Sequence, residues 1–404
     1  MNKEIKPLEK AWEEGRAKNI TFIVTKDCQL ACKYCYLVGK NDKERMSFST
    51  AKKAIDYILA HRTLFPERSV EFDFIGGEPL LEVSLINEIC DYIKQQLFKL
   101  NHPWFNSYRF CFATNGLLYI SEAVQNFILK NHSHLSIEIT IDGTKKKHDL
   151  NRIYVNGRGS YDDVLKSIPK WLEQFPECGT KVTISHEDLP YIKESVLHLF
   201  SLGITVVNIN VVFEDVWAEG DDKIFEEQLL LLADTMIDSG LYENHVCSFF
   251  VDNIGKPLNP AIDNGNWCGS GQMLSVDAAG NFYPCTRFAA YSLREKKPII
   301  IGNVRDGIDR NKLRPFLTLD RTTQSPQKCL ECEVASGCAW CQGENYDAAD
   351  TDTIYQRSTA ICKMHKARVR ANNYYWNKLF RKLELEGKRE EFERNHPKHH
   401  SPIC

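Results

Sequence analysis

Residues 20–36 read ITFIVTKDCQLACKYCY, an apolar segment followed at once by three cysteines. Cys28, Cys32 and Cys35 have the spacing C-x3-C-x2-C, which places three thiols within eight residues. Three thiolates bind three irons of a cubane cluster, and without a fourth cysteine one iron stays open to another ligand. The alternatives are a zinc knuckle or buried core thiols, because zinc accepts similar spacings and isolated cysteines pack as small hydrophobes. The loop therefore predicts an iron-sulfur cluster with one iron available for chemistry.

Six short apolar segments rich in β-branched residues predict strands, and segments with helical periodicity lie between them. The strands are expected at residues 20–24, 70–75, 109–114, 135–141, 181–184 and 205–212. The helices are expected at 49–60, 84–100, 121–129, 161–173 and 189–202, with N-caps at Ser49, Ser84 and Ser121. Strands that alternate with helices predict repeated βα units around a parallel sheet.

These units predict an α/β fold in the form of an open, partial (β/α)6 TIM barrel, with a Rossmann-like sheet as the competing architecture. Ligands of such a barrel bind at the C-terminal ends of its strands. Four expected strand ends carry distinctive residues, namely the cysteine loop and the motifs at 76–79 (GGEP), 114–116 (TNG) and 142–143 (DG). We therefore expect these four loops to meet at one rim.

The cysteine loop, with the aromatic Tyr34 just before its third cysteine, resembles the cluster loop of radical S-adenosylmethionine (SAM) enzymes. The resemblance implies that the open iron chelates the amino and carboxylate groups of SAM. It also implies that an electron from the cluster cleaves the sulfonium to a 5'-deoxyadenosyl radical. On this resemblance we favour the partial barrel over the Rossmann-like sheet.

Other strand ends carry motifs that resemble the SAM-binding motifs of the same enzymes. The GGEP run resembles the motif whose backbone and acidic side chain receive the amino group of SAM, and its glycines are expected to let the chain approach the ligand. The pattern of Thr140, Asp142, the pair His148-Asp149 and Arg152 resembles that of peptide-modifying members, in which the arginine pairs with the SAM carboxylate. We expect His148 and Asp149 to cap a helix instead. The predicted SAM contacts are Tyr34, Gly76, Gly77, Glu78, Pro79, Asn115, Thr140, Asp142 and Arg152.

Seven more cysteines gather in a region where the strand and helix patterns fade, so metal ligands are expected to stabilise a small second domain. A zinc ribbon is one interpretation of this set. Its spacing resembles the SPASM domain, the auxiliary-cluster module of radical SAM enzymes that modify peptides and proteins. The set comprises Cys268, Cys285, Cys329, Cys332, Cys338, Cys341 and Cys362.

The SPASM resemblance implies two auxiliary clusters with crossed ligation. One would be held by Cys329, Cys332, Cys338 and Cys362, and the other by Cys268, Cys285 and Cys341. The family pattern has three residues before the fourth cysteine of the cluster-rich run, whereas two precede Cys341 here. The second set is one ligand short, and we infer an open iron that binds a substrate thiolate. The expected cofactors are thus SAM and three [4Fe-4S] clusters, with ordinary thiols at Cys90, Cys111, Cys178, Cys247 and Cys404.

Composition limits the partners and the compartment. The 404 residues include 51 basic and 54 acidic side chains. The net charge of -3 gives no excess of positive charge that would attract nucleic acid or an anionic membrane. The start of the chain is charged, and no apolar run approaches the roughly 18 residues of a membrane span. Fifteen cysteines without a signal peptide favour metal ligation in a reducing compartment, so we expect a cytoplasmic location.

The sequence divides into five expected parts. They are an N-terminal extension (1–19), the barrel (20–218), a helical connector (219–262), the SPASM domain (263–366), and a C-terminal helix with its tail (367–404). The helix is expected at 367–385. We expect the tail, with His396, His399 and His400, to be solvated rather than metal-binding.

The resemblance implies a peptide maturase, and the open auxiliary site favours one that forms thioether cross-links, as ranthipeptide synthases do. The expected partners are a Cys-rich precursor peptide and an electron donor such as flavodoxin or ferredoxin. An anaerobic sulfatase-type formylglycine maturase and a carbon-carbon cross-linking enzyme remain as alternatives on the same fold. A zinc-stabilised binding module without enzymatic activity is the alternative outside it.

Overall fold

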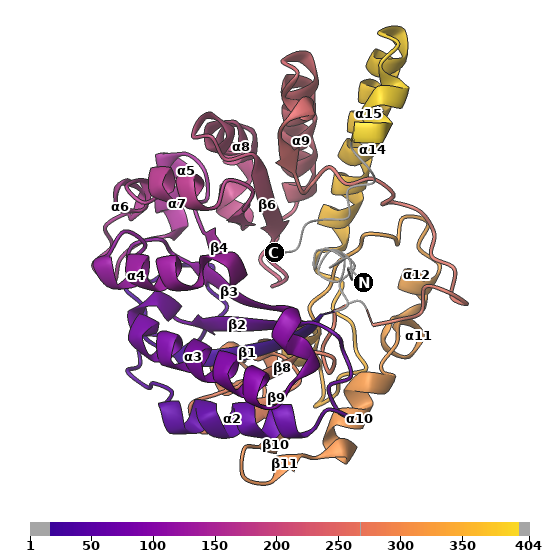
Figure 1. Ribbon diagram of the computed structural model, residues 1–404. Helices are drawn as coiled ribbons and strands as arrows, with labels where there is room; N and C mark the ends of the chain where they lie inside the picture. Colours follow the sequence, from indigo (N-terminus) through magenta and orange to yellow (C-terminus); the bar gives the residue numbers. More distant parts are fainter. Residues whose placement is uncertain (1–16, 267, 396–404) are drawn as a thin grey trace, which may run out of the picture.

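The computed structural model describes residues 17–266 and 268–395 (Figure 1). Most of the expected N-terminal extension and the whole of the histidine-containing tail, with Cys404, lie outside the described residues. Within them, no helix is both long enough and apolar enough to cross a bilayer.

The first six strands follow one another in space in the order of the sequence. They are β1 (Lys18–Thr25), β2 (Val70–Gly76), β3 (Tyr108–Thr114), β4 (Leu135–Ile139), β5 (Thr180–Ile184) and β6 (Val206–Val211). Strands β1 to β4 pair in parallel, β5 pairs in parallel with β6, and the bridge between Thr140 and Lys181 links the two sets. This order has no reversal of the kind that defines a Rossmann-like sheet. The prediction of an open, partial (β/α)6 barrel is therefore confirmed.

Helices connect these strands, but several begin at residues other than those predicted. They are α2 (Phe48–Ala60), α3 (Val83–Lys99), α4 (Glu122–Asn131), α5 (Lys145–Asn151), α6 (Tyr161–Leu165), α7 (Ile168–Gln174) and α8 (Ile192–Ser201). The N-cap of α2 is Ser47, whose Oγ accepts a hydrogen bond from the Thr50 N–H at 3.0 Å, so the assignment to Ser49 was wrong. A 3-10 turn (Pro79–Glu82) runs directly into α3 and makes Glu82 its N-cap in place of Ser84. Ser121 does precede α4.

Prolines explain the two other differences in helix length. The predicted helix at 161–173 is divided into α6 and α7, with Pro169 in the first turn of α7. Proline lacks the N–H that a continuous helix needs and is tolerated only in a first turn. In the same way, a 3-10 segment (His186–Tyr191) that contains Pro190 precedes α8, so this helix begins three residues later than predicted.

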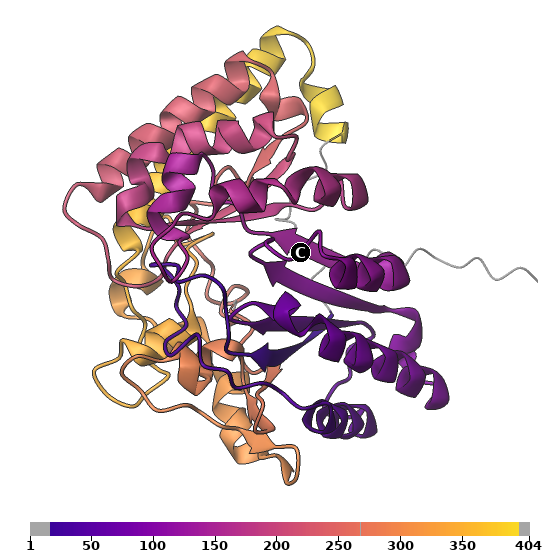
Figure 2. The ribbon, with the colours of Figure 1, turned by 90° about the vertical axis from the view of Figure 1, so that its left-hand side faces the viewer.

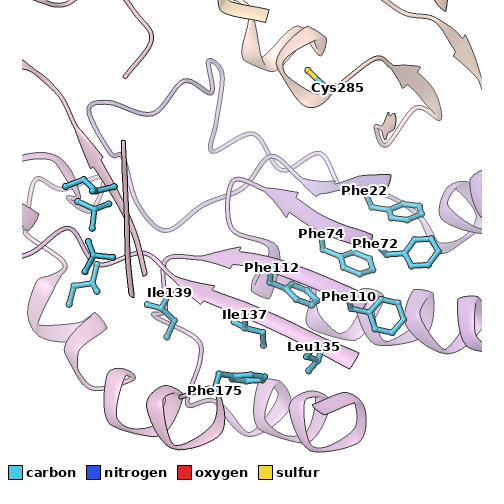
Figure 3. Close-up of a cluster of buried hydrophobic side chains, with 14 of the residues drawn as sticks. Phe22, Phe72, Phe74, Phe110, Phe112, Leu135, Ile137, Ile139, Phe175 and Cys285 are labelled. Carbon is cyan, nitrogen blue, oxygen red and sulfur yellow. The ribbon is translucent and has the colours of Figure 1, made fainter. Parts of the chain in front are cut away.

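The core lies between the parallel sheet and its helices. Phe22 stacks on Phe74 with ring centroids 5.7 Å apart, and Phe74 stacks on Phe112 at 5.2 Å (Figure 3). Phe112 then meets Phe127 of α4 edge to face, which ties the helix layer to the sheet. Side chains alternate along a strand, so Asp73, between Phe72 and Phe74, points to the opposite, inner face. Burial and the nearby Glu71 raise the pKa of Asp73 to about 7.

The cysteine-rich region continues the same sheet. Its strands β8 (Leu274–Val276), β9 (Asn281–Tyr283), β10 (Gly302–Asn303) and β11 (Gly307–Ile308) extend the sheet beyond β1, and β8 runs parallel to β1. In Figure 2 the early helices, indigo to purple, and the cysteine-rich region, orange to yellow, lie on opposite sides of the strands. The cysteine-rich loops are therefore held against the first strand, whose end leads into the cysteine loop.

Two long helices lie on the side of the molecule where β6 is found (Figure 1). Helix α9 (Asp221–Asp238) and helix α14 (Cys362–Leu385) pack side by side, with Arg370 of α14 binding both carboxylate oxygens of Glu226 of α9. Helix α14 begins at Cys362, five residues before the predicted start, so the last cysteine of the cysteine-rich set lies in its first turn. The remaining elements are β7 (Val246–Cys247), α10 (Arg310–Thr318), α11 (Arg321–Gln324), α12 (Gln327–Leu330), α13 (Gln342–Asp347) and α15 (Arg389–Asn395).

Candidate active site and cluster sites

The loop after β1 holds its three thiols close together. Burial raises the pKa of Cys28 to about 12, and the neighbouring Glu78 and Cys32 add to the rise. Burial also raises the pKa of Cys32, although Arg152 and Lys40 oppose it. A thiolate buried at such a position would need a neighbouring positive charge, which a bound metal would supply. Cys28, Cys32 and Cys35 are the residues that would hold a cluster at this loop.

Glu78, the acidic residue of the GGEP motif, is fully buried and binds groups of the protein itself. Its Oε1 accepts hydrogen bonds from Thr114 Oγ1 at 2.6 Å and from the Leu80 N–H at 3.1 Å. Its Oε2 accepts one from the Asn115 N–H at 2.8 Å. Glu78 thus joins the ends of β2 and β3 and fixes the position of Asn115.

The glycine pair of the same motif allows two chain segments to approach each other closely. A Cβ atom on Gly76 would lie 2.2 Å from the Thr25 carbonyl oxygen, and one on Gly77 would lie 2.2 Å from that of Asp27. The Gly77 N–H donates to the Thr25 carbonyl at 3.0 Å. The structure thus gives a reason that differs from the expected approach to a ligand, since the glycines let the cysteine loop pack on the end of β2.

Asn115 and Thr140 lie at the ends of β3 and β4, as predicted. The Asn115 Nδ2 group donates to Gln29 Oε1 at 3.0 Å and lies 4.0 Å from Cys28 Sγ, so this side chain contacts the cysteine loop. The Thr140 N–H donates to the Thr114 carbonyl at 2.9 Å, which leaves its hydroxyl half-buried beside the same rim.

Tyr34, Asp142 and Arg152 form one hydrogen-bonded group behind the cysteine loop. The Tyr34 hydroxyl donates to Asp142 Oδ2 at 2.5 Å and accepts from Arg152 Nη1 at 3.0 Å. Burial alone would raise the pKa of Asp142, but Lys147 and Arg152 hold it below its ordinary value. Arg152 Nε is buried with no acceptor, and an unpaired buried donor of this kind suits a ligand carboxylate such as that of SAM.

The expectation that His148 and Asp149 cap a helix is half right. Asp149 Oδ1 accepts from the N–H of Tyr161, the first residue of α6, at 2.9 Å. His148 is no cap, because its Nδ1 accepts from the Asp142 N–H at 3.2 Å and its other ring nitrogen lies 3.0 Å from Ser160 Oγ. Burial lowers the pKa of His148 to about 3, so the ring is neutral and holds the Asp142 loop in place.

The four cysteines predicted for one auxiliary cluster surround a single cavity. Cys329, Cys332, Cys338 and Cys362 all line a space of about 90 Å³. Burial raises the pKa of Cys338, and the other three thiols contribute to the rise. Arg357 Nη2 donates to Cys338 Sγ at 3.1 Å, and its guanidinium lies 4.3 Å from the centre of the Trp340 ring. The four thiols thus line one cavity, and they are the residues that would hold a cluster there.

The other predicted set also comes together. Burial raises the pKa of Cys285 well above its ordinary value, with further contributions from Cys268 and Cys341. Cys268 Sγ accepts a hydrogen bond from the Gln342 N–H at 3.4 Å. Cys341 therefore groups with Cys268 and Cys285 in spite of its unusual spacing. Among the described residues, no three His, Cys, Asp or Glu side chains are placed to share a single metal ion.

One cavity of about 460 Å³ adjoins the cysteine loop and reaches the second half of the chain. Its walls combine Tyr34, Cys35 and Tyr36 with residues that follow β5 and β6, including Glu214, and with Arg294 of the cysteine-rich region. Four site residues were not predicted from the sequence, because no spacing pattern marks them: Tyr36, Glu214, Arg287 and Arg294. The proximity of Tyr36 to Cys35 and of Arg287 to Cys285 was the available signal.

Comparisons with known proteins agree with this geometry. The family described as a 4Fe-4S single cluster domain matches residues 14–166. The cysteine-type anaerobic sulfatase-maturating enzyme of Clostridium novyi is 29% identical over 353 residues, which cover 82% of this chain and 90% of that protein. The structure of native anSMEcpe with bound AdoMet superposes with a TM-score of 0.67 at 17% identity, covering 89% of this chain and 99% of that one. Streptococcus suis SuiB bound to precursor peptide SuiA gives a TM-score of 0.58 at 13% identity, with 85% and 75% covered.

Proposed function

We propose that this chain is a radical SAM enzyme of the SPASM type that forms thioether cross-links in a Cys-rich, ribosomally made precursor peptide. In this proposal SAM and the [4Fe-4S] clusters would supply a 5'-deoxyadenosyl radical. The clusters would also accept the electron that is released when carbon and sulfur join. The net change in the peptide is the loss of one C–H and one S–H hydrogen and the gain of one C–S bond. The activity is that of an oxidoreductase.

The observation that carries this proposal is the contact between the cysteine loop and the three-cysteine set. Tyr36 directly follows Cys35, and the Arg287 guanidinium carbon lies 4.4 Å from the centre of its ring. Arg287 in turn follows Cys285 by one intervening residue, and its charge lies beside Cys341. One segment of a peptide bound in the adjoining cavity would thus reach both the site of hydrogen abstraction and the site that binds a thiol.

The residues around the SAM site have separate tasks in the proposal. Cys28, Cys32 and Cys35 hold the first cluster, and Arg152 binds the SAM carboxylate through its unpaired Nε–H. Tyr34 and Asp142 orient Arg152, while Glu78 positions Asn115 at the rim. Gly76, Gly77 and Pro79 shape the strand end that carries Glu78, and Thr140 completes the rim. The two auxiliary sets hold the other two of three clusters.

The 460 Å³ cavity is the proposed place for the reacting segment of the peptide. Its wall carries positive charges at Lys33 and Arg294 and negative charges at Glu187 and Glu214. Such a wall can bind a polar peptide backbone. The aromatic rings of Tyr34 and Tyr36 line this cavity beside the loop, and a peptide bound over them would shield a radical from water. A flavodoxin or ferredoxin would supply the electron, in a reducing compartment such as the cytoplasm.

Mass spectrometry tests the proposed reaction. Reduced enzyme is incubated anaerobically with SAM and a Cys-rich peptide, and the proposal expects a loss of two hydrogens per cross-link together with one blocked thiol. Peptides that keep every thiol free while 5'-deoxyadenosine accumulates would contradict thioether formation.

The similarity to a cysteine-type sulfatase-maturating enzyme favours a second candidate, oxidation of a cysteine to formylglycine. A carbon-carbon cross-linking activity is a further variant on the same fold. A sulfatase-derived cysteine peptide separates the candidates, because its conversion to an aldehyde with loss of sulfur would support the maturase. A Cys285→Ala protein that still modified peptides at the wild-type rate would also favour these candidates over the thioether reaction.

A further inference from the structure

Arg287 lies between the cysteine loop, the barrel and the three-cysteine set. Its Nη2 donates to Glu214 Oε1, which follows β6, and to Glu344 Oε2 of α13, both at 2.9 Å. Its guanidinium also stacks on the Tyr36 ring. Only 14% of its side chain is exposed. One side chain therefore connects all three parts of the candidate site.

The Nε–H of Arg287 is a buried donor with no acceptor. An unpaired buried donor is destabilising, so a position of this kind calls for an explanation. The Arg287 guanidinium lies beside Cys341 of the three-cysteine set. The backbone N–H of Arg287 also donates to the Cys285 thiol.

The packing of α13 fixes Arg287 in this position. A Cβ atom on Gly343 would lie 2.3 Å from Arg287 Cβ, so the helix backbone rests directly on this residue. Glu344 is held from its other side by Arg294 Nη2 at 2.6 Å. The side chain is thus anchored at both its root and its tip, and its free Nε–H keeps a constant direction.

The four-cysteine set contains the same arrangement in complete form. There Arg357 stacks on Trp340 and donates to Cys338 Sγ at 3.1 Å. At the three-cysteine set Arg287 stacks on Tyr36, but its Nε–H has no sulfur to bind. The two arginines thus differ in that the Arg357 side chain donates to a sulfur through Nη2, whereas the Arg287 side chain has a free Nε–H and donates to no sulfur.

We propose that Arg287 is a positioning residue whose Nε–H binds the sulfur of a substrate cysteine thiolate at the three-cysteine set. The inference rests on the proposed function, since it assumes that this set accepts a thiol from the peptide. A thiolate is the form of cysteine that binds metals, and a fixed guanidinium stabilises that anion. Arg287 would therefore select thiolates over hydroxyl groups at this position.

The test measures thiol binding without turnover. A full-length Cys28→Ala/Cys32→Ala/Cys35→Ala protein carries only the auxiliary clusters, and N-acetylcysteine methylamide is titrated while the EPR spectrum of the dithionite-reduced protein is recorded. We expect a saturable thiol-dependent change, with N-acetylserine methylamide giving none. In the same background, Arg287→Met should raise the apparent Kd by about tenfold, which corresponds to about 1.4 kcal/mol.

Two further variants keep the result interpretable. Arg287→Lys retains the charge but lacks the guanidinium group, so we expect a partial loss of thiol affinity at unchanged iron and sulfide content. This variant decides the question where Arg287→Met loads clusters poorly. Arg370→Met removes an arginine that binds Glu226 between α9 and α14, outside the candidate site, and we expect a Kd within about twofold of the parent. An equal loss in Arg370→Met, or equal thiol binding in the parent and in both Arg287 variants, would overturn the role of Arg287. A parent protein that shows no thiol response would instead refute the thiol-binding function itself.

Discussion

At the scale of single residues, the site depends on side chains that orient other side chains. Tyr34 is the clearest case, because its hydroxyl binds both Asp142 and Arg152 while its backbone lies between two cysteines of the loop. The loop spacing predicted the cysteines, but it carried no information on this partnership. The partners of Tyr34 are more than 100 residues away, and only the fold brings them together.

Tyr34→Phe tests this partnership. The variant keeps the ring but removes the hydroxyl, so Asp142 Oδ2 loses its tyrosine donor and Arg152 Nη1 loses its acceptor. We expect iron content close to that of the wild type and a Kd for SAM raised by about tenfold, in line with the loss of a charge-assisted hydrogen bond. Equilibrium dialysis of reconstituted protein measures it. Unchanged SAM affinity would mean that Tyr34 does not position Arg152.

Asp73 gives a prediction on pH. Its pKa is about 7 in the folded protein, raised by burial and by Glu71 and Glu138, while Thr21 lowers it. Tyr36 and Tyr291 also lie near it, but burial raises the pKa of both phenols, so they stay neutral in this pH range. The raised pKa means that the folded protein favours the neutral carboxyl group of Asp73. The contribution of this group to the free energy of unfolding is therefore present at low pH and is lost as the pH rises through 7.

Asp73→Asn removes that titration. Between pH 6 and pH 8 the wild type should lose on the order of 1 kcal/mol more stability than the variant. Anaerobic thermal melts at the two pH values measure the difference. Parallel pH dependence of the wild type and Asp73→Asn would show that Asp73 is not protonated in the folded state.

At the scale of secondary structure, the pattern of the sequence predicted the elements better than their ends. All six strands of the barrel were expected, because apolar β-branched segments are long-range features of the sequence. Ser49 and Ser84 were misassigned because the helix starts depend on Ser47 and on the turn before α3. The glycine pair after β2 was recognised by motif, but its packing reason needed the neighbouring loop.

Gly77→Ala tests that packing reason. An added methyl group would meet the Asp27 carbonyl oxygen at 2.2 Å, so the cysteine loop must move away from β2. We expect reduced iron loading of the first cluster and a stability loss of about 2 kcal/mol or more, as for overpacked sites. Gly265→Ala is the matched control, because nothing lies within 4 Å of a Cβ at that position. Equal iron content and melting temperature in both variants would contradict the packing reason.

At the scale of the whole molecule, ten cysteines gather at three places, in groups of three, three and four. The sequence resemblance predicted these groups, and the structure brings together the members of each one. The contact between the first two groups was not predictable, because Arg287 and Tyr36 are about 250 residues apart and no motif connects them. The shared cavity likewise depends on how the cysteine-rich region packs on the barrel.

Removal of iron tests how far the clusters organise the second half. The loops between α10 and α14 contain only short helices, so we expect chelation under denaturant-free conditions to expose them first. Hydrogen exchange should rise most in residues 320–361, while β1 to β4 stay protected. Uniform protection across both halves after iron loss would show that packing alone holds the cysteine-rich region.

The central claim is that Cys28, Cys32 and Cys35 hold a cluster that cleaves SAM reductively. Quantifying 5'-deoxyadenosine from reconstituted, dithionite-reduced protein under anaerobic conditions tests it most directly. The account predicts SAM-dependent formation of 5'-deoxyadenosine by the wild type and none by Cys32→Ala. Fully iron-loaded wild type that produces no 5'-deoxyadenosine, or Cys32→Ala that produces as much, would contradict it.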